Sequence, residues 1–546
     1  MARGLLISFS GYPVVVSSLF PDNGLASLAG TLLSHGHEVK VLDFNTVDTV
    51  RRLVPPERTE RLAALLPALS AEPGPDVLEQ VFEVNASFEE DLSRVADELS
   101  EEIAAEIESQ NAQFIGFKLW SGDGFLVSVR IAEKLRELFP ELQIYGGGPA
   151  VLYSEHAVFK YTKAFNALVD GEGELAILGL AAHSEGKGVL ADVPNLIIPD
   201  GSSFRRTARI MCDDLNSLAC PVYSPEIYPS LVGDRQIKVF ILDESRGCPM
   251  GCAFCIHQDA SGNRWRLKSA GRIVEEIREV SEQFGVSSFM LGGSYTPAKF
   301  FREFADSLVG DRVHIRFCGF AHPGGLPNDL LKPLSSAGFK SVFLGVESFD
   351  RSDLARLGKR LDPEKAKDTI RSCQEADIVP VVSVIVPVPG QTPEGLNATR
   401  EALVSLCKDA PSTVCTGFPG LLPRTRWWAN RSEYGFELQV DEEEYRSILA
   451  AYKIRHIVPP AFWEALPYTL DGNDFRGYAG ANARFQRDLA NEGLAVNISY
   501  DVTLLSDVVG RDLHSFRGEL QKLFFTLDSE ALGRFVTDVN VRLRSS

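Results

Sequence analysis

The stretch ESRGCPMGCAFC, residues 244–255, places Cys248, Cys252 and Cys255 in the spacing C-x3-C-x2-C. A structural zinc site needs four ligands, usually from two separated pairs, and the nearest candidate for a fourth ligand is His257. An iron–sulfur cubane held by three cysteines instead leaves one iron without a protein thiolate, so that this iron can bind a substrate or cofactor. The spacing therefore favours a catalytic iron–sulfur cluster over zinc.

A plain electron carrier would need a fourth thiolate near the cluster, and Cys220 and Cys318 are the candidates. The chain has nine cysteines, an odd number that is spread over 546 residues and does not suggest a disulfide framework. Clustered thiolates fit a reducing compartment. The apolar N-terminal run has no small-residue cleavage site, and no apolar span reaches 18 residues. We therefore expect a cytoplasmic protein without a membrane partner.

From residue 238 onward, strand and helix patterns alternate strictly. The predicted strands are KVFILDESRG, SSFMLGG, HIRFCGFA, SVFLGVES, VPVVSVIVPVPG and STVCTGFP, each followed by a helix or a loop. Six such units predict a partial (β/α)6 barrel of the TIM type over residues 238–424, with its chemistry at the carboxyl ends of the strands. The cysteine loop follows the first strand and therefore lies at that end.

Residues 1–190 also alternate strand and helix, which predicts an α/β domain with a doubly wound parallel sheet and helices on both faces. A helical insertion is expected at about 46–112. The loops SFSGYP, WSGDG and YGGGPA follow strand ends, where such sheets bind ligands. No P-loop lysine motif or GxGxxG occurs there, which disfavours a nucleotide. Residues 191–237 are expected to form a connector, and residues 425–546 a mostly helical, substrate-facing C-terminal cap.

The cysteine motif, read as C-x3-C-x-aromatic-C with Phe254 as the aromatic residue, resembles that of the radical S-adenosylmethionine (SAM) enzymes. The resemblance implies a [4Fe–4S] cluster whose open iron chelates SAM, and an electron that breaks a C–S bond of SAM to give a 5′-deoxyadenosyl radical. Ser294 stands where the family usually has an acidic residue. The SAM-binding residues implied in this way are Phe254, Gly292, Gly293, Ser294, Glu347 and Ser383, and the alternative for Glu347 is a salt bridge inside the barrel.

The N-terminal half resembles the cobalamin-binding domain of one large subgroup of that family, in LASLAGTLLSHGHEVKVLDF, GFKLWSGD, YGGGPAV and LVDGEGE. The D-x-H-x-x-G signature of a histidine ligand to cobalt is absent, and His35 and His37 are expected in a surface turn. The resemblance therefore implies a lower cobalt face without a histidine ligand. The cobalamin-binding residues that it implies are Ser121, Gly122, Gly147, Gly148 and Glu172.

Together the two resemblances imply a methyltransferase that moves a methyl group from methylcobalamin to a non-nucleophilic carbon or phosphorus of a small antibiotic precursor. An external electron donor, such as flavodoxin or ferredoxin, would reduce the cluster. Arg424 and Arg426 follow the sixth strand, and such a pair can hold a carboxylate or phosphinate, or can be solvated surface. Size and layout are compatible with the phosphinate P-methyltransferases of phosphinothricin-type antibiotic biosynthesis.

The alternatives are a cobalamin-dependent cyclase or rearrangement enzyme and a cobalamin sensor. A methylthiotransferase is disfavoured because residues 1–211 contain no cysteine for a second cluster. The formal net charge of −19 argues against nucleic-acid binding, and hence against a DNA-binding regulator.

Overall fold

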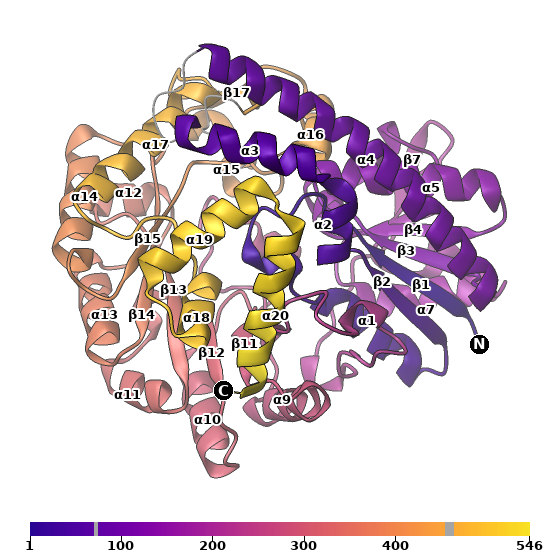
Figure 1. Ribbon diagram of the computed structural model, residues 1–546, viewed down its shortest axis with the longest axis horizontal. Helices are drawn as coiled ribbons and strands as arrows, with labels where there is room; N and C mark the ends of the chain where they lie inside the picture. Colours follow the sequence, from indigo (N-terminus) through magenta and orange to yellow (C-terminus); the bar gives the residue numbers. More distant parts are fainter. Residues whose placement is uncertain (70–74, 454–462, 546) are drawn as a thin grey trace.

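Two sheets, one in each half of the chain, organise the protein (Figure 1). The structure is a computed structural model that describes residues 1–69, 75–453 and 463–545. Within these parts of the chain, every helix is too short or too polar to serve as a membrane span.

The first sheet has seven strands in the order β2-β1-β3-β4-β5-β6-β7. The strands β1 to β5 are parallel, as predicted, while β6 and β7 form an antiparallel edge. This edge comes from residues 191–237, which were expected to form a connector. The segment belongs to the sheet because β6 pairs with β5 and its residues Leu196, Ile197 and Ile198 are buried. The strands are β1 (Arg3–Ser8), β2 (Glu38–Asp43), β3 (Phe114–Lys118), β4 (Gln143–Gly147), β5 (Ala167–Val169), β6 (Leu196–Asp200) and β7 (Ser203–Arg206).

Helices cover both faces of this sheet. The helices α1 (Asn23–Ser34) and α7 (Gly173–Ser184) pack together, and α4 (Pro75–Gln110) packs on α5 (Asp123–Leu138) on the other side (Figure 1). The expected insertion is helical and comprises α2 (Val47–Leu53), α3 (Pro56–Leu69) and α4. It reaches the C-terminal region, because α3 packs against α19 (Leu513–Thr526).

The second sheet is fully parallel, in the order β15-β14-β13-β12-β11-β8, as predicted for a (β/α)6 barrel. Its outer helices contact one another in sequence. The strands are β8 (Phe240–Leu242), β11 (Ser288–Leu291), β12 (Arg316–Ala321), β13 (Phe339–Glu347), β14 (Val379–Ile385) and β15 (Thr413–Gly417). The outer helices are α9 (Ala270–Phe284), α10 (Ala298–Gly310), α11 (Asn328–Ser336), α13 (Pro363–Glu375) and α14 (Pro393–Cys407).

The C-terminal region does more than cap the barrel. The helix α18 (Tyr500–Val509) packs against β11, β12 and β13. Tyr500 contacts Phe320 and Phe343 from these strands, with ring centroids 4.7 and 5.9 Å apart. Other elements of this region are α16 (Glu442–Ala451), α17 (Phe475–Asn491), α19 (Leu513–Thr526), α20 (Ser529–Ser545) and the small antiparallel pair β16 (Phe436–Leu438) and β17 (Tyr468–Leu470).

Candidate cofactor site

The cysteine loop begins after β8 and the short strand β9 (Ser245–Arg246). Gly247 has φ of +84°, and a Cβ atom there would lie 2.0 Å from the carbonyl oxygen of Arg264, so that only glycine fits. Two backbone hydrogen bonds fix the far side of the loop: the amide of Ala253 donates to Leu357 at 2.8 Å, and the amide of Trp427 donates to Ala253 at 3.0 Å. The loop is therefore held by three separate segments of the chain.

The three cysteines of this loop are free and half-buried. Burial raises the pKa of each thiol, that of Cys252 to about 11, and the charges of Cys248 and Cys255 act in the same direction on Cys252. The sulfur atoms therefore lie near one another. The buried ammonium of Lys359 opposes this rise at all three sites, so that it favours the thiolate form that a metal needs.

Lys359 is held by Glu347, with 3.2 Å between Nζ and Oε1. Glu347 ends β13 with φ of +71°, an unusual backbone conformation for a residue other than glycine. Both side chains are about nine-tenths buried. The predicted SAM ligand Glu347 thus forms the salt bridge that was its alternative, and it positions a cation beside the cysteines.

The other candidate ligands for a metal have partners elsewhere. The Nδ1 atom of His257 lies 3.1 Å from Oγ of Ser294, and Cys318 is buried on β12. Glu279 contributes to the raised pKa of Cys220, which places that thiol beside α9. Among the described residues, no group of three or more His, Cys, Asp or Glu side chains is placed to hold a single metal ion.

The predicted SAM loop Gly292–Ser294 rests on a residue that the sequence analysis missed, Glu244. The amide of Gly293 donates to Oε2 of Glu244 at 2.9 Å, and the hydroxyl of Thr296 donates to Oε1 at 2.5 Å. Burial raises the pKa of this fully buried carboxyl group to about 7. Its signal in the sequence is an acidic residue two positions after the end of β8 and two positions before Arg246.

Two further predicted SAM residues, Phe254 and Ser383, lie on the cysteine loop and on strand β14, respectively. Phe254 packs on Trp427, with 5.7 Å between the ring centroids. Ser383 is half-buried on β14, in register with Gly345 on one side and Cys415 on the other. Phe254 therefore supports the loop, while Ser383 stays a predicted SAM contact.

Two cavities adjoin these loops. The N-terminal cavity, of about 480 Å³, lies at the carboxyl ends of β1, β2 and β3 and includes Ser121 and Gly122. The interdomain cavity, of about 340 Å³, lies between Gly148 and the barrel loops. Pro149 lines both, so the cavities are neighbours. The interdomain cavity also includes Glu172, Gly247, His257, Gly292 and Ser294.

The remaining predicted cobalamin residue, Gly147, is the last residue of β4, and its carbonyl accepts a hydrogen bond from Leu119 at 2.7 Å. His35 and His37 lie in the turn before β2, at the amino end of this strand, whereas the N-terminal cavity lies at its carboxyl end. A cobalt face without a histidine ligand stays a prediction.

Two predicted ligand-binding residues, Glu172 and Arg424, have partners within the protein. Glu172 accepts a hydrogen bond from Arg266 at 2.6 Å and one from the amide of Cys212 at 2.7 Å. Arg424 donates two hydrogen bonds to Asp170, at 2.6 and 2.7 Å, and one to Glu155 at 2.7 Å.

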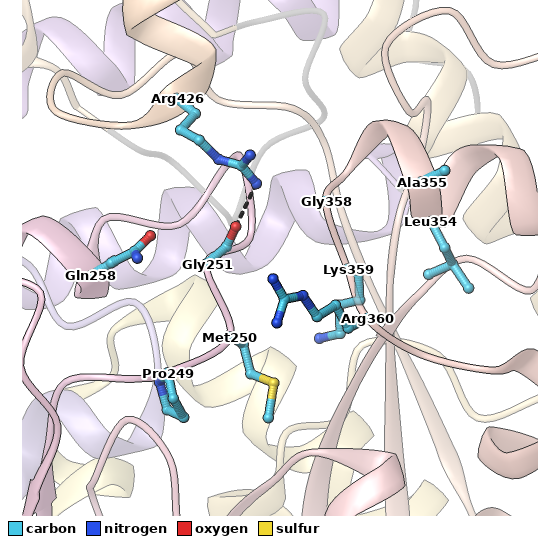
Figure 2. A pocket seen from close by; sticks show the side chains of 10 residues that line it. All are labelled: Pro249, Met250, Gly251, Gln258, Leu354, Ala355, Gly358, Lys359, Arg360 and Arg426. Carbon is cyan, nitrogen blue, oxygen red and sulfur yellow. Dashed lines mark hydrogen bonds between the residues drawn. The ribbon is translucent and has the colours of Figure 1, made fainter.

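These contacts join the first sheet to the barrel, because Glu172 and the partners of Arg424 belong to the N-terminal half. Arg426 instead donates to the carbonyl of Gly251 (Figure 2). Arg424 and Arg426 therefore have different partners in the fold, and a role for them in substrate binding stays a prediction. Arg424 and Arg426 are close together in the sequence, but the partner of each depends on the tertiary structure.

Comparison with known proteins agrees with this geometry. Residues 245–403 match the family model of the radical SAM superfamily. The chain contains a radical SAM domain. This domain begins at β9 and ends within α14, so that it includes the cysteine loop and most of the barrel. The prediction of a radical SAM domain in this part of the chain is thereby confirmed.

Relatives of the radical SAM domain extend the similarity. The chain is 23% identical to the uncharacterized methyltransferase PH0819 of Pyrococcus horikoshii, over 61% of this chain and 72% of that protein. It is 25% identical to the anaerobic magnesium-protoporphyrin IX monomethyl ester cyclase of Synechocystis, over 46% of this chain and 51% of the cyclase. The chain thus spans about half the length of the cyclase.

One solved structure shares the fold over almost the whole chain. It is the radical SAM methyltransferase TsrM from Kitasatospora setae, solved with cobalamin and a [4Fe–4S] cluster bound. The TM-score is 0.64 at 17% sequence identity, and the match covers 98% of this chain and 100% of that chain. The predicted order of an α/β domain, a partial barrel and a helical C-terminal region is therefore confirmed.

The residues present fit the groups that a radical SAM domain holds. Three free thiols share one loop beside the buried ammonium of Lys359, and this cation offsets the charge of a thiolate-ligated cluster. The interdomain cavity opens beside Gly247 and Gly292, so that a ligand can reach the cysteine loop. Cys248, Cys252 and Cys255 are therefore the residues that would hold the [4Fe–4S] cluster.

Proposed function

We propose that the protein is a cobalamin-dependent radical SAM methyltransferase. It would move a methyl group from methylcobalamin to an unactivated carbon or a phosphinate phosphorus of a small antibiotic precursor. The observation that carries the proposal is the pair of cavities that meet at Pro149. One is formed by the glycine-bearing loops of the first sheet and the other by the cysteine side of the barrel, so that two cofactors would lie against each other.

The N-terminal cavity has the features of a corrinoid pocket. Lys118 pairs with Asp22 at 2.6 Å and lies 4.4 Å from the centroid of the Trp120 ring, which fixes one wall. Phe524 and Leu527 from the C-terminal region contribute apolar surface to the same cavity. When bound, cobalamin would supply a methyl group on cobalt.

The C-terminal cap contacts the edge of this cavity at Gly122. It has φ of +67°, its amide donates to the carbonyl of Ala450 at 2.9 Å, and a Cβ atom there would lie 2.8 Å from the carbonyl of Tyr452. Lys453 also pairs with Asp123 at 3.0 Å. These contacts join the cap to the edge of the cavity and support a role of Gly122 in shaping the pocket.

On the barrel side, Glu244 and the Glu347–Lys359 pair would position the second site. Glu244 orients the amide of Gly293, and Lys359 places positive charge next to the cysteines. When bound, the cluster and SAM together would supply hydrogen abstraction from the substrate. Because Arg424 is committed to Asp170 and Glu155, it gives no support to a phosphinate over a carbon centre.

A second candidate function is cobalamin-dependent cyclisation, which the similarity to the Synechocystis cyclase favours. Anaerobic reconstitution with iron, sulfide and hydroxocobalamin tests the common part of both functions. We expect absorbance bands of a cluster and of a bound corrinoid in one protein. A gain of one labelled methyl group by the product, from methyl-labelled SAM, supports the methyltransferase. Formation of 5′-deoxyadenosine without methyl transfer would contradict it.

A further inference from the structure

An open groove of about 500 Å³ lies on the cysteine loop. Pro249, Met250 and Gly251 form one wall. The other wall is formed by Leu354 and Ala355 from α12 (Arg351–Arg356) and by Gly358, Lys359 and Arg360 (Figure 2). Arg426, the first residue of α15 (Arg426–Ala429), reaches across to the carbonyl of Gly251. We call this feature the cluster-loop groove.

The cluster-loop groove is cationic, although the whole chain has a formal net charge of −19. Lys359, Arg360 and Arg426 line it, and no Asp or Glu is among the described residues that do so. Arg360 is exposed and has no ion pair with any described residue, and Arg426 contacts only a carbonyl group. Some exposed arginines elsewhere, such as Arg302 with Asp329, have a carboxylate partner. The groove therefore presents uncompensated positive charge to a partner.

A groove between α2 and α20 shows that this is not a general property of the surface. Its described lining residues mix both signs of charge, with Asp48, Asp234 and Glu530 beside Arg51 and Arg235. Only the cluster-loop groove, among the cavities described above, combines positive charge with an absence of acidic lining residues in the described chain.

The cluster-loop groove also lies close to the cysteines that would hold the cluster. Met250 is two residues from Cys248 and two from Cys252, so that its Cα atom is within about 7 Å of both. Lys359 lines the groove while its ammonium acts on the same two thiols. An electron that arrives in the groove therefore has a short path to the cysteine sulfurs.

We propose that the cluster-loop groove docks the electron donor, a small acidic carrier protein of the flavodoxin or ferredoxin class, through Arg360 and Arg426. This inference rests on the proposed function only in requiring a reducible cluster. One electron leaves the reduced carrier and enters the cluster, while no bond forms or breaks. Complementary charge would mainly accelerate the encounter and orient the carrier.

Binding tests this proposal without any turnover. Reconstituted protein is titrated with an oxidised flavodoxin, and separately with an oxidised ferredoxin, by isothermal titration calorimetry. We expect Arg360→Glu to raise the Kd of at least one carrier about tenfold, and added salt to weaken wild-type binding. The matched control is Arg312→Glu: Arg312 is exposed, precedes β12 and therefore lies at the opposite end of the barrel strands. Equal Kd values for the two variants would overturn the proposal.

Reduction of the cluster gives an independent readout. Loss of cluster absorbance is followed after mixing with reduced carrier or with dithionite, a small reductant that needs no docking surface. We expect Arg360→Glu to slow reduction by the carrier about tenfold and to leave reduction by dithionite unchanged. An equal loss with dithionite would overturn the proposal, because the substitution would then act on the cluster itself. Neither assay depends on methyl transfer, so failure of the proposed function is recognised separately.

Discussion

Replacement of Arg424 by alanine should destabilise the protein rather than impair substrate binding. The guanidinium is 11% exposed, and it pairs with Asp170 at 9% and Glu155 at 12% exposure. Removal of one partner from a buried ion pair costs about 3–5 kcal/mol, because the remaining charge stays buried without compensation. Arg206 also contacts both carboxylates, including Asp170 at 2.9 Å, and retains part of the compensation. We therefore expect Arg424→Ala to lower the free energy of unfolding by about 3 kcal/mol, the lower end of this range.

Urea unfolding followed by intrinsic fluorescence measures this effect. With an m-value of about 3 kcal/mol/M, the expected cost lowers the urea midpoint by about 1 M. The matched control is Arg426→Ala, since Arg426 is exposed and donates only to the carbonyl of Gly251. Its loss should cost about 1 kcal/mol or less. An unchanged midpoint for Arg424→Ala, together with an increased KM for the substrate, would show that Arg424 binds substrate and would refute this reasoning.

Three further outcomes follow from the site. Because the folded-state pKa of Glu244 is raised to about 7 from 4.5, stability should fall as pH rises from about 4.5 to 7. Glu244→Gln removes the ionisable group and therefore this loss. The difference in unfolding free energy between variant and wild type, measured by urea unfolding, should be up to about 3 kcal/mol more favourable to the variant at pH 8 than at pH 4.5. An equal difference at both pH values would show that ionisation of Glu244 is not the cause. Cys252→Ala should abolish the cluster absorbance after reconstitution while circular dichroism is retained, and an intact cluster would exclude Cys252 as a ligand. Gly122→Val should strongly reduce corrinoid retention on gel filtration, because its side chain meets the backbone of Tyr452, and normal retention would contradict the assigned role in shaping the pocket.

Short-range patterns in the sequence were sufficient to predict the parallel strands of the two sheets and the cysteine loop. Apolar runs of strand length that alternate with helical repeats indicate parallel β/α units, because both periodicities follow from local backbone geometry. The C-x3-C-x2-C spacing is likewise local, and Gly247 is required by the approach of a neighbouring backbone. The antiparallel edge at β6 and β7 was missed because its three-residue apolar core resembles a connector.

Only the tertiary structure decided what the charged residues of the site do. Arg424 and Arg426 are two positions apart, yet one pairs with the first sheet and the other contacts the cysteine loop. Glu172 meets Arg266 across the domain boundary, and Glu347 meets Lys359. A long charged side chain can pair with segments that are distant in sequence. Which partner it has depends on burial and on which opposite charges the packing brings within a few ångströms. The sequence by itself determined the chemistry that the loop can hold, whereas the packing of the two halves determined the adjoining cavities and the cationic groove around it.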